Sequence, residues 1–128
     1  STAIVGGAKV SSKIDILANL LNRVDNIIIG GGMAYTFILA KGGQVGDSLV
    51  EKDKVGLAKE ILEKAKQKGV NILLPVDSIN ASKFANDADI ITSDIMNIPS
   101  GYMGLDIGKQ SVMTFSNILL ESKTILWN

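Results

Sequence analysis

Residues 2–24 read TAIVGGAKVSSKIDILANLLNRV, and the expected fold class follows from this stretch. The apolar run Thr2 to Val5 is typical of a buried strand, and the pair Gly6-Gly7 closes it. Apolar residues then return at three- and four-residue spacing, as on one helix face: Ile14, Leu17, Leu20, Leu21 and Val24. The stretch predicts a strand, a glycine turn and a helix. We expect the Ser12 hydroxyl and the Asp15 carboxylate to be partners for the free N–H groups at the helix start.

The same unit repeats along the chain. Residues 26–29 predict a strand ended by three glycines, followed by a helix over 33–41. Further helices are predicted over 53–68 and around 112–119, and further strands over 70–74, 88–92, 105–107 and 124–127, with residues 76–98 of mixed pattern. The strands are continuous apolar runs, which indicates a parallel sheet covered on both faces. The predicted class is α/β, a doubly wound, Rossmann-like parallel sheet with helices on both faces.

Composition narrows the range of functions. The chain has 128 residues, of which 46% are apolar and 20% charged, so at most one globular domain is expected. Thirteen basic residues balance thirteen acidic ones, and no broad basic field is left for nucleic acid or an acidic membrane. Cysteine and histidine are absent, which excludes disulfides, thiol nucleophiles, imidazole catalysis and the usual zinc ligands. No apolar run or leader suggests a membrane anchor. We expect an intracellular protein that binds neither nucleic acid nor membrane.

Both ends of the sequence look like sheet strands. The chain starts without methionine at residues 1–5 and stops at residues 124–128, each an apolar run. Our hypothesis is that residues 1–128 are an excised, incomplete domain of a longer protein.

Three turns carry glycine directly after a predicted strand, at residues 6–9, 30–32 and 104–108. Backbone amides without a neighbouring Cβ can approach a bulky ligand, and ligands of such sheets lie where the strands end. Lys9 and Lys13 add two ammonium groups to one helix start, an arrangement that suits a polyphosphate. The alternative is that the glycines only shape tight turns. Neither a P-loop nor a complete dinucleotide fingerprint is present.

Five aspartates match no calcium loop and are predicted to be turn and surface residues: Asp77, Asp87, Asp89, Asp94 and Asp106.

Five blocks of the sequence resemble the phosphoglycerate kinase family, in its order and at its spacings. They are VGGAKVSSK at 5–13, IGGGMAYTF at 29–37, LLPVD at 73–77, GLDIG at 104–108 and the closing Trp127-Asn128. The resemblance spans almost the whole chain. It implies that residues 1–128 are the first part of that family's C-terminal, nucleotide-binding domain, without the N-terminal substrate domain and the rest of the C-terminal domain.

The resemblance implies an activity and a set of site residues. The activity is glycolytic: reversible phosphoryl transfer between 1,3-bisphosphoglycerate and ADP, giving 3-phosphoglycerate and ATP, in a cytoplasmic monomer with magnesium as Mg-ADP or Mg-ATP. Lys9 would contact the transferring phosphoryl group and Lys13 the nucleotide phosphates. Asn128 would lie beside the nucleotide, and six residues would border adenine and ribose: Gly7, Ala8, Gly31, Gly32, Leu49 and Gly108.

Some expected parts are missing or altered. Ser12 stands where the family usually has aspartate, and Lys109 where proline is common. The domain that binds 3-phosphoglycerate and the aspartate that ligates magnesium are expected outside residues 1–128, so we expect no metal ligand here and no turnover from this chain alone. Two alternatives remain: a non-catalytic α/β module that binds a nucleotide or dinucleotide, and a structural remnant whose glycines only form turns.

Overall fold

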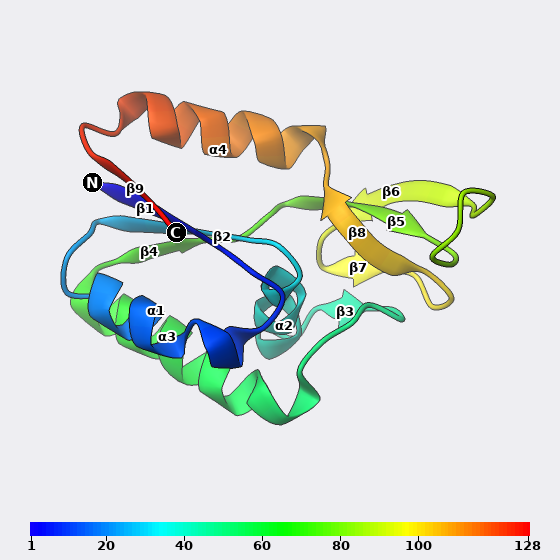
Figure 1. Cartoon of the computed structure of the whole chain (residues 1–128), viewed down its shortest axis with the longest axis horizontal. Coiled ribbons are helices and arrows are strands. Elements are labelled where there is room, and N and C mark those ends of the chain that lie inside the picture. The colour runs from blue at the N-terminus through cyan, green and yellow to red at the C-terminus, as the bar shows by residue number, and fades with distance from the viewer.

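The computed structural model describes residues 1–128 and is built around a four-stranded parallel sheet (Figure 1). Its strands are β1 (Thr2–Gly6), β2 (Asn26–Gly30), β4 (Asn71–Leu73) and β9 (Ile125–Trp127). Their order is β4-β2-β1-β9, and every neighbouring pair is parallel. The predicted parallel sheet is confirmed, including the strand at the C-terminal end.

The helices cover both faces of this sheet. The chain steps from β1 to β2 to β4 in one direction, so right-handed crossovers place α1 (Ile14–Leu20), α2 (Met33–Ala40) and α3 (Val55–Lys68) on one face. It then returns past β1 to β9, which places α4 (Lys109–Glu121) on the opposite face, as Figure 1 shows. The strand order therefore switches between β1 and β9. None of these helices combines the length and apolar character needed to cross a membrane.

The main core lies between the sheet and the three-helix face. Ile27 and Ile29 of β2 are fully buried and pack with Leu17 of α1, Phe37 of α2 and Ile61 of α3. Leu17 belongs to the predicted apolar stripe, and Ile27 and Ile29 belong to a predicted strand, so their burial follows the helical and strand periodicities. The sequence pattern thus locates the core correctly.

The start of α1 differs from the prediction. A 3₁₀ turn, η1 (Val10–Ser12), precedes the helix, and Lys13 rather than Ser12 is its N-cap residue. The Ser12 hydroxyl donates to the Lys9 carbonyl (2.9 Å) and caps no helix amide. The expectation for Ser12 is therefore wrong, because the extra turn moves the first helical residue to Ile14. A second 3₁₀ turn, η2 (Lys52–Lys54), leads into α3, which ends at Lys68, as predicted, and has Gly69 with φ 70° as its C-cap residue.

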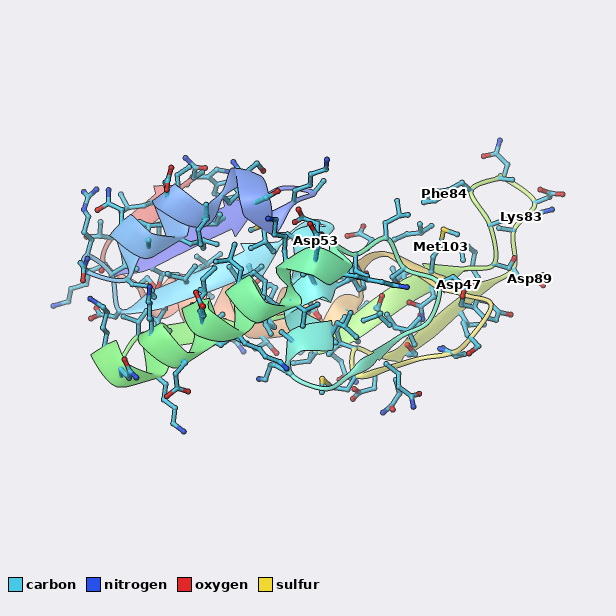
Figure 2. All side chains as sticks on the ribbon, turned by 90° about the horizontal axis from the view of Figure 1, so that it is seen from below. Asp47, Asp53, Lys83, Phe84, Asp89 and Met103 are labelled. Atoms are coloured by element: carbon cyan, nitrogen blue, oxygen red, sulfur yellow. The ribbon has the colours of Figure 1, made fainter.

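A smaller lobe, which the sequence did not predict as a unit, extends from the parallel sheet. Here β5 (Asp77–Ala81), β6 (Ile90–Asp94) and β8 (Met103–Ile107) form an antiparallel sheet in the order β6-β5-β8, and β3 (Gln44–Val45) pairs in parallel with β7 (Asn97–Ile98). Figure 2 shows Lys83, Phe84 and Asp89 at the far tip of this lobe. Ser78 and Asn80 of β5 are fully buried, so polar residues form this strand's inner face.

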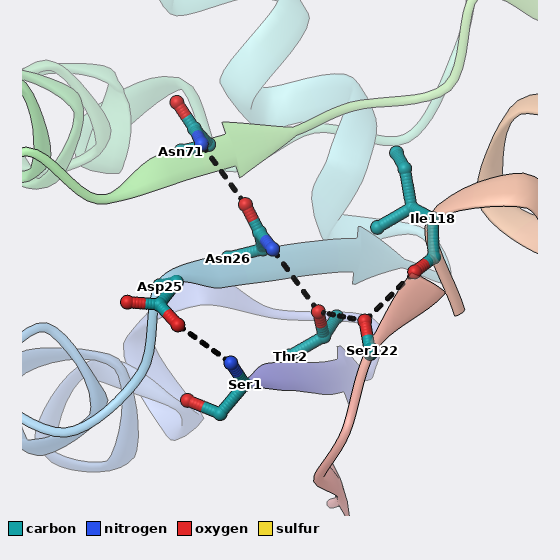
Figure 3. A network of polar contacts seen from close by, with 7 residues as sticks. All are labelled: Ser1, Thr2, Asp25, Asn26, Asn71, Ile118 and Ser122. Carbon is teal, nitrogen blue, oxygen red and sulfur yellow. Dashed lines mark hydrogen bonds and ion pairs between the residues drawn. The ribbon is translucent and has the colours of Figure 1, made fainter. Parts of the chain in front are cut away.

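A line of polar side chains ties the strands together near their amino ends (Figure 3). Asn71 donates to Asn26 (2.9 Å), and Asn26 donates to the Thr2 hydroxyl (3.1 Å). The Ser122 hydroxyl donates to the carbonyl of Ile118 (2.7 Å), so its oxygen accepts the hydrogen of Thr2 Oγ1 (2.6 Å). These bonds join β4, β2, β1 and the segment after α4. The polar groups at this end are thus used by the protein itself.

Asp77 fastens the lobe to α4. Its carboxylate accepts the backbone N–H groups of Gln110 and Ser111, each at 3.0 Å, and also the Ser111 hydroxyl. Burial opposes ionisation of Asp77, but these hydrogen bonds outweigh it and hold the pKa of the carboxyl below its ordinary value. The prediction that Asp77 is a surface residue is wrong: it is only 7% exposed and caps a helix.

Asp77→Asn is expected to lower the free energy of unfolding at pH 7 by about 1–2 kcal/mol, because a charged helix cap is replaced by a weaker neutral one. The folded-state pKa lies below the unfolded value, so this contribution is present above the unfolded pKa and is lost as the pH falls through the folded one. Urea unfolding between pH 7 and about pH 3 should show the two proteins converging at acidic pH. Asp89→Asn is the control, since the Asp89 side chain is exposed. A difference independent of pH would contradict the role of the Asp77 charge.

Candidate functional site

The first two glycine turns touch at the carboxyl ends of β1 and β2. Gly6 and Gly30 are paired in the sheet, and the Met33 N–H donates to the Gly7 carbonyl (3.0 Å). Gly31 has φ +72°, and a Cβ at this position would lie 2.6 Å from the Gly7 oxygen. Only glycine therefore permits this approach without a backbone shift. The structure therefore brings together two of the three glycine turns that were expected to approach a ligand.

Both turns present free backbone donors. The amides of Met33, Ala34 and Tyr35 are used within the protein, by the carbonyls of Gly7, Gly31 and Gly32 in that order. Five neighbouring N–H groups have no acceptor in the protein: those of Gly7, Ala8, Lys9, Gly31 and Gly32. Two of the five precede α2, where the helix dipole favours negative charge. This arrangement of donors is suited to an anion such as a phosphate group.

The switch in strand order coincides with these turns. Gly7 follows β1, and Asn128 follows β9, the neighbour of β1 on its other side. Asn128 continues the pairing, since its N–H donates to Ile4 (2.8 Å) and its carbonyl accepts from Gly6 (3.1 Å). A ligand of an open α/β sheet lies in the crevice at such a switch point. The topology therefore points to the same edge as the free amides.

Lys13 lies across this edge. Its ammonium donates to Asn128 Oδ1 (3.1 Å), and its aliphatic stem covers Gly7, where a Cβ would approach Lys13 Cε to 3.1 Å. Lys9 is exposed, and its ammonium makes no hydrogen bond or ion pair within the protein. One cation is thus held over the first turn, and the other is free to meet a ligand.

Leu49 lies in the loop before α3 and is 73% exposed. Two residues later, Glu51 accepts hydrogen bonds from the Ser11 hydroxyl (2.6 Å) and the Ser11 N–H (3.3 Å), which brings this loop beside the Lys9 turn. Partial burial opposes ionisation of Glu51, but the bonds from Ser11 and the charge of Lys9 hold the pKa of its carboxyl below its ordinary value. The structure therefore brings the Leu49 loop, though no contact of Leu49 itself, to the edge of the site.

The third glycine turn differs from the other two. Gly108 is buried at the start of α4, and a Cβ there would lie 2.2 Å from Asp77 Oδ2. Its N–H donates to the Asp77 carbonyl (3.4 Å), and the next helix amides are taken by the Asp77 side chain. This turn therefore offers few free donors. Gly108 faces Asp77, and its contact with a nucleotide stays a prediction.

The third turn still contributes an apolar wall next to the second. A small pocket there is lined by Gly31, Ala34, Tyr35, Pro75, Leu105, Asp106 and Ile107. Leu105 is 45% exposed although it lies on β8. The sequence pattern predicted only a strand at Leu105 and did not mark it as a candidate site residue. The sequence feature that could have marked Leu105 is its position between Gly104 and Gly108, in the third glycine turn.

Cavity size alone does not identify the site. The largest cavity, about 810 Å³, lies between α3 and the edge strand β4, away from both touching turns. It contains none of the residues with free amides. The candidate site is marked instead by the free amides, the two ammonium groups and the switch in strand order.

The chain offers no evident cradle for a resident metal ion. No group of three or more Asp, Glu, His or Cys side chains is placed to hold one. The donor set of residues 1–128 therefore does not fit a protein-bound magnesium.

The comparisons with known proteins agree with one another. A family model described as Phosphoglycerate kinase matches residues 1–128. A phosphoglycerate kinase of Clostridium botulinum is 53% identical over 126 residues, covering 98% of this chain and 32% of the relative. A phosphoglycerate kinase of Clostridioides difficile is 56% identical over 127 residues, covering 99% of this chain and 32% of the relative.

Solved structures give the same picture. The phosphoglycerate kinase of Coxiella burnetii superposes with a TM-score of 0.94 at 40% identity, covering 99% of this chain and 33% of that one. The enzyme of Pyrococcus horikoshii superposes with a TM-score of 0.79 at 27% identity, covering 100% and 33%. The chain thus spans about a third of the length of the relatives it matches.

Proposed function

Because the chain belongs to the phosphoglycerate kinase family, we propose that it supplies part of the nucleotide site of an enzyme that transfers a phosphoryl group reversibly between 1,3-bisphosphoglycerate and ADP. The products are 3-phosphoglycerate and ATP. Since the chain spans a third of its relatives, the activity is proposed for a longer protein in which residues 1–128 are part of the C-terminal domain. The 3-phosphoglycerate side is assigned to an N-terminal domain outside this sequence.

The observation that carries the proposal is the set of five free amides beside Lys9 and Lys13 at one sheet edge. Phosphoryl transfer from an acyl phosphate to a diphosphate requires little proton removal. It is accelerated chiefly by fixed donors and positive charge around the transferring group. A site built from amides and ammonium groups can therefore perform this chemistry without histidine.

We assign the two lysines different roles. Lys13 is held over Gly7 by Asn128, so its ammonium meets the nucleotide phosphates beside the free amides. Lys9 has no partner in the protein, so its ammonium meets the phosphoryl group during transfer. A positive charge placed where negative charge develops in the transition state lowers the barrier. A positive charge that only binds the substrate lowers it less.

The base and ribose are proposed to lie on the apolar side of the second turn. Gly31 and Gly32 provide backbone surface, and Leu105 provides an apolar wall in the adjoining pocket. Leu49 is proposed to close this side from its exposed loop. Magnesium is proposed to be present as Mg-ADP or Mg-ATP, because the chain offers no acidic cluster for it. The cytoplasmic location and monomeric state implied by the family are part of the same proposal.

The proposal is tested by calorimetric titration of the full-length protein with ATP and with NAD. We expect binding of ATP and no measurable binding of NAD, because the second turn lacks the last glycine of a dinucleotide fingerprint. In a coupled assay, the full-length protein should form ATP from 1,3-bisphosphoglycerate and ADP, and a protein consisting of residues 1–128 should not. Preference for NAD would favour the non-catalytic module. Turnover by residues 1–128 alone would contradict the need for a second domain.

A further inference from the structure

Glu51 uses all of its polar groups to join three segments at the edge of the site. Its carboxylate accepts from the Ser11 hydroxyl (2.6 Å) and the Ser11 N–H (3.3 Å). Its own N–H donates to the Thr36 hydroxyl of α2 (3.2 Å), and its carbonyl accepts from Lys54 at the start of α3 (2.9 Å). One residue thus connects the turn that carries Lys9, the helix after the second glycine turn, and α3.

These connections lead to rigid parts of the fold. Thr36 is fully buried on α2, so the backbone N–H of Glu51 is attached to a residue packed inside the fold. Val10, between Lys9 and Ser11, is also fully buried. The ammonium of Lys9 has no partner of its own. Its position therefore depends on how the backbone of residues 9–11 is held, and Glu51 provides the side-chain contact that holds Ser11.

The charge of Glu51 fits this contact. A carboxylate that accepts a hydroxyl and an amide bonds them more strongly than a neutral group would. The nearby Lys9 stabilises the same charge. Hydrogen bonds from Ser11 engage both oxygens of the carboxylate, and neither the Gly7 amide nor the Ala8 amide donates to Glu51.

We propose that Glu51 is a positioning residue for phosphoryl transfer: it keeps the Lys9 turn in register with α2 and with the loop that carries Leu49. Fixing a reacting group within a fraction of an ångström decides a large part of its catalytic effect, and small misplacements are costly. Glu51 touches neither substrate in this arrangement and acts through Lys9. The inference rests on the proposed function, in which Lys9 meets the transferring phosphoryl group.

The test uses the full-length enzyme with Glu51→Ala, Glu51→Gln and Ser11→Ala. Glu51→Ala should lower kcat about 10- to 30-fold while changing the KM for the nucleotide by less than about threefold. Glu51→Gln keeps an acceptor for Ser11 and should lose less than about threefold. Ser11→Ala removes one of the two hydrogen bonds between Ser11 and Glu51. Its kcat should lie between those of Glu51→Ala and Glu51→Gln. Glu60→Ala is the control, because it removes an exposed carboxylate of α3. Its kcat and KM should match those of the unmodified enzyme.

A double-mutant cycle with Lys9→Ala separates positioning from a general structural role. If Glu51 acts through Lys9, then adding Glu51→Ala to Lys9→Ala should lower kcat by less than about twofold. Multiplicative losses, or a normal kcat in folded Glu51→Ala, would overturn the inference and leave the proposed function intact. Normal activity of Lys9→Ala would overturn the proposed role of Lys9 and this inference with it. If Glu51→Ala fails to fold, Ser11→Ala and Glu51→Gln carry the same comparison.

Discussion

Lys9→Ala in the full-length enzyme is expected to lower kcat by about 10²- to 10³-fold, the usual result of removing one preorganised group that stabilises transition-state charge. The free ammonium of Lys9 is the group in this chain that we assign to the transferring phosphoryl. The KM for the nucleotide should change little, because Lys13 and the free amides still bind the phosphates. Steady-state kinetics in the coupled assay measures both constants.

Two further variants make this result specific. Lys64→Ala removes an exposed lysine from α3, away from the glycine turns, and should leave both constants unchanged. Lys13→Ala should act mainly on the KM for the nucleotide, since its ammonium lies over Gly7 beside Asn128. If Lys9→Ala stays within a few-fold of the unmodified kcat, the role that we give to Lys9 is wrong.

Gly31→Ala is expected to lower the free energy of unfolding by about 2–5 kcal/mol and to remove measurable nucleotide binding. Alanine at φ +72° costs about 1–2 kcal/mol, and its Cβ would overlap the backbone of Gly7, at 2.6 Å from the oxygen and 2.8 Å from the nitrogen. A backbone shift that relieves this overlap adds about 1–3 kcal/mol and separates the two turns. Urea unfolding measures the stability, and calorimetric titration with ATP measures binding.

Gly30→Ala is the matched control. A Cβ on Gly30 would meet no atom within 4 Å, and its φ is not positive. This variant should keep the contact between the two turns and lose little stability. Equal stability of the Gly31 and Gly30 variants would show that the contact between the turns is not needed.

The parallel sheet and the meeting of two glycine turns could be predicted from the sequence because both depend on local patterns. The run from Ile27 to Ile29 is apolar at every position, as a strand buried on both faces requires. Once two strands are parallel, their carboxyl ends lie at one edge, and the glycines after them are neighbours. The meeting of the first two glycine turns therefore requires only that β1 and β2 are parallel neighbours.

The rest depends on partners distant in sequence. Ser78 and Asn80 are polar, so β5 did not read as a strand, and the hydroxyl of Tyr35 on α2 provides the partner (2.8 Å) that lets Ser78 be buried. Asp77 is held by residues 33 and 34 positions away, and Glu51 by a serine 40 positions away. No periodicity signals such pairs. The same limitation hid Leu105, which becomes a candidate site residue only when β8 lies beside Gly31.

The contact of Lys13 with Asn128 joins residues 115 positions apart, and this separation fixes an order of events during synthesis. At about 5–20 residues per second, a ribosome finishes Asn128 roughly 6–23 s after Lys13. The glycine turn after β1 is thus made well before the residue that holds Lys13 over it. Lys13 can take its place only after β9 has been made and has paired with β1.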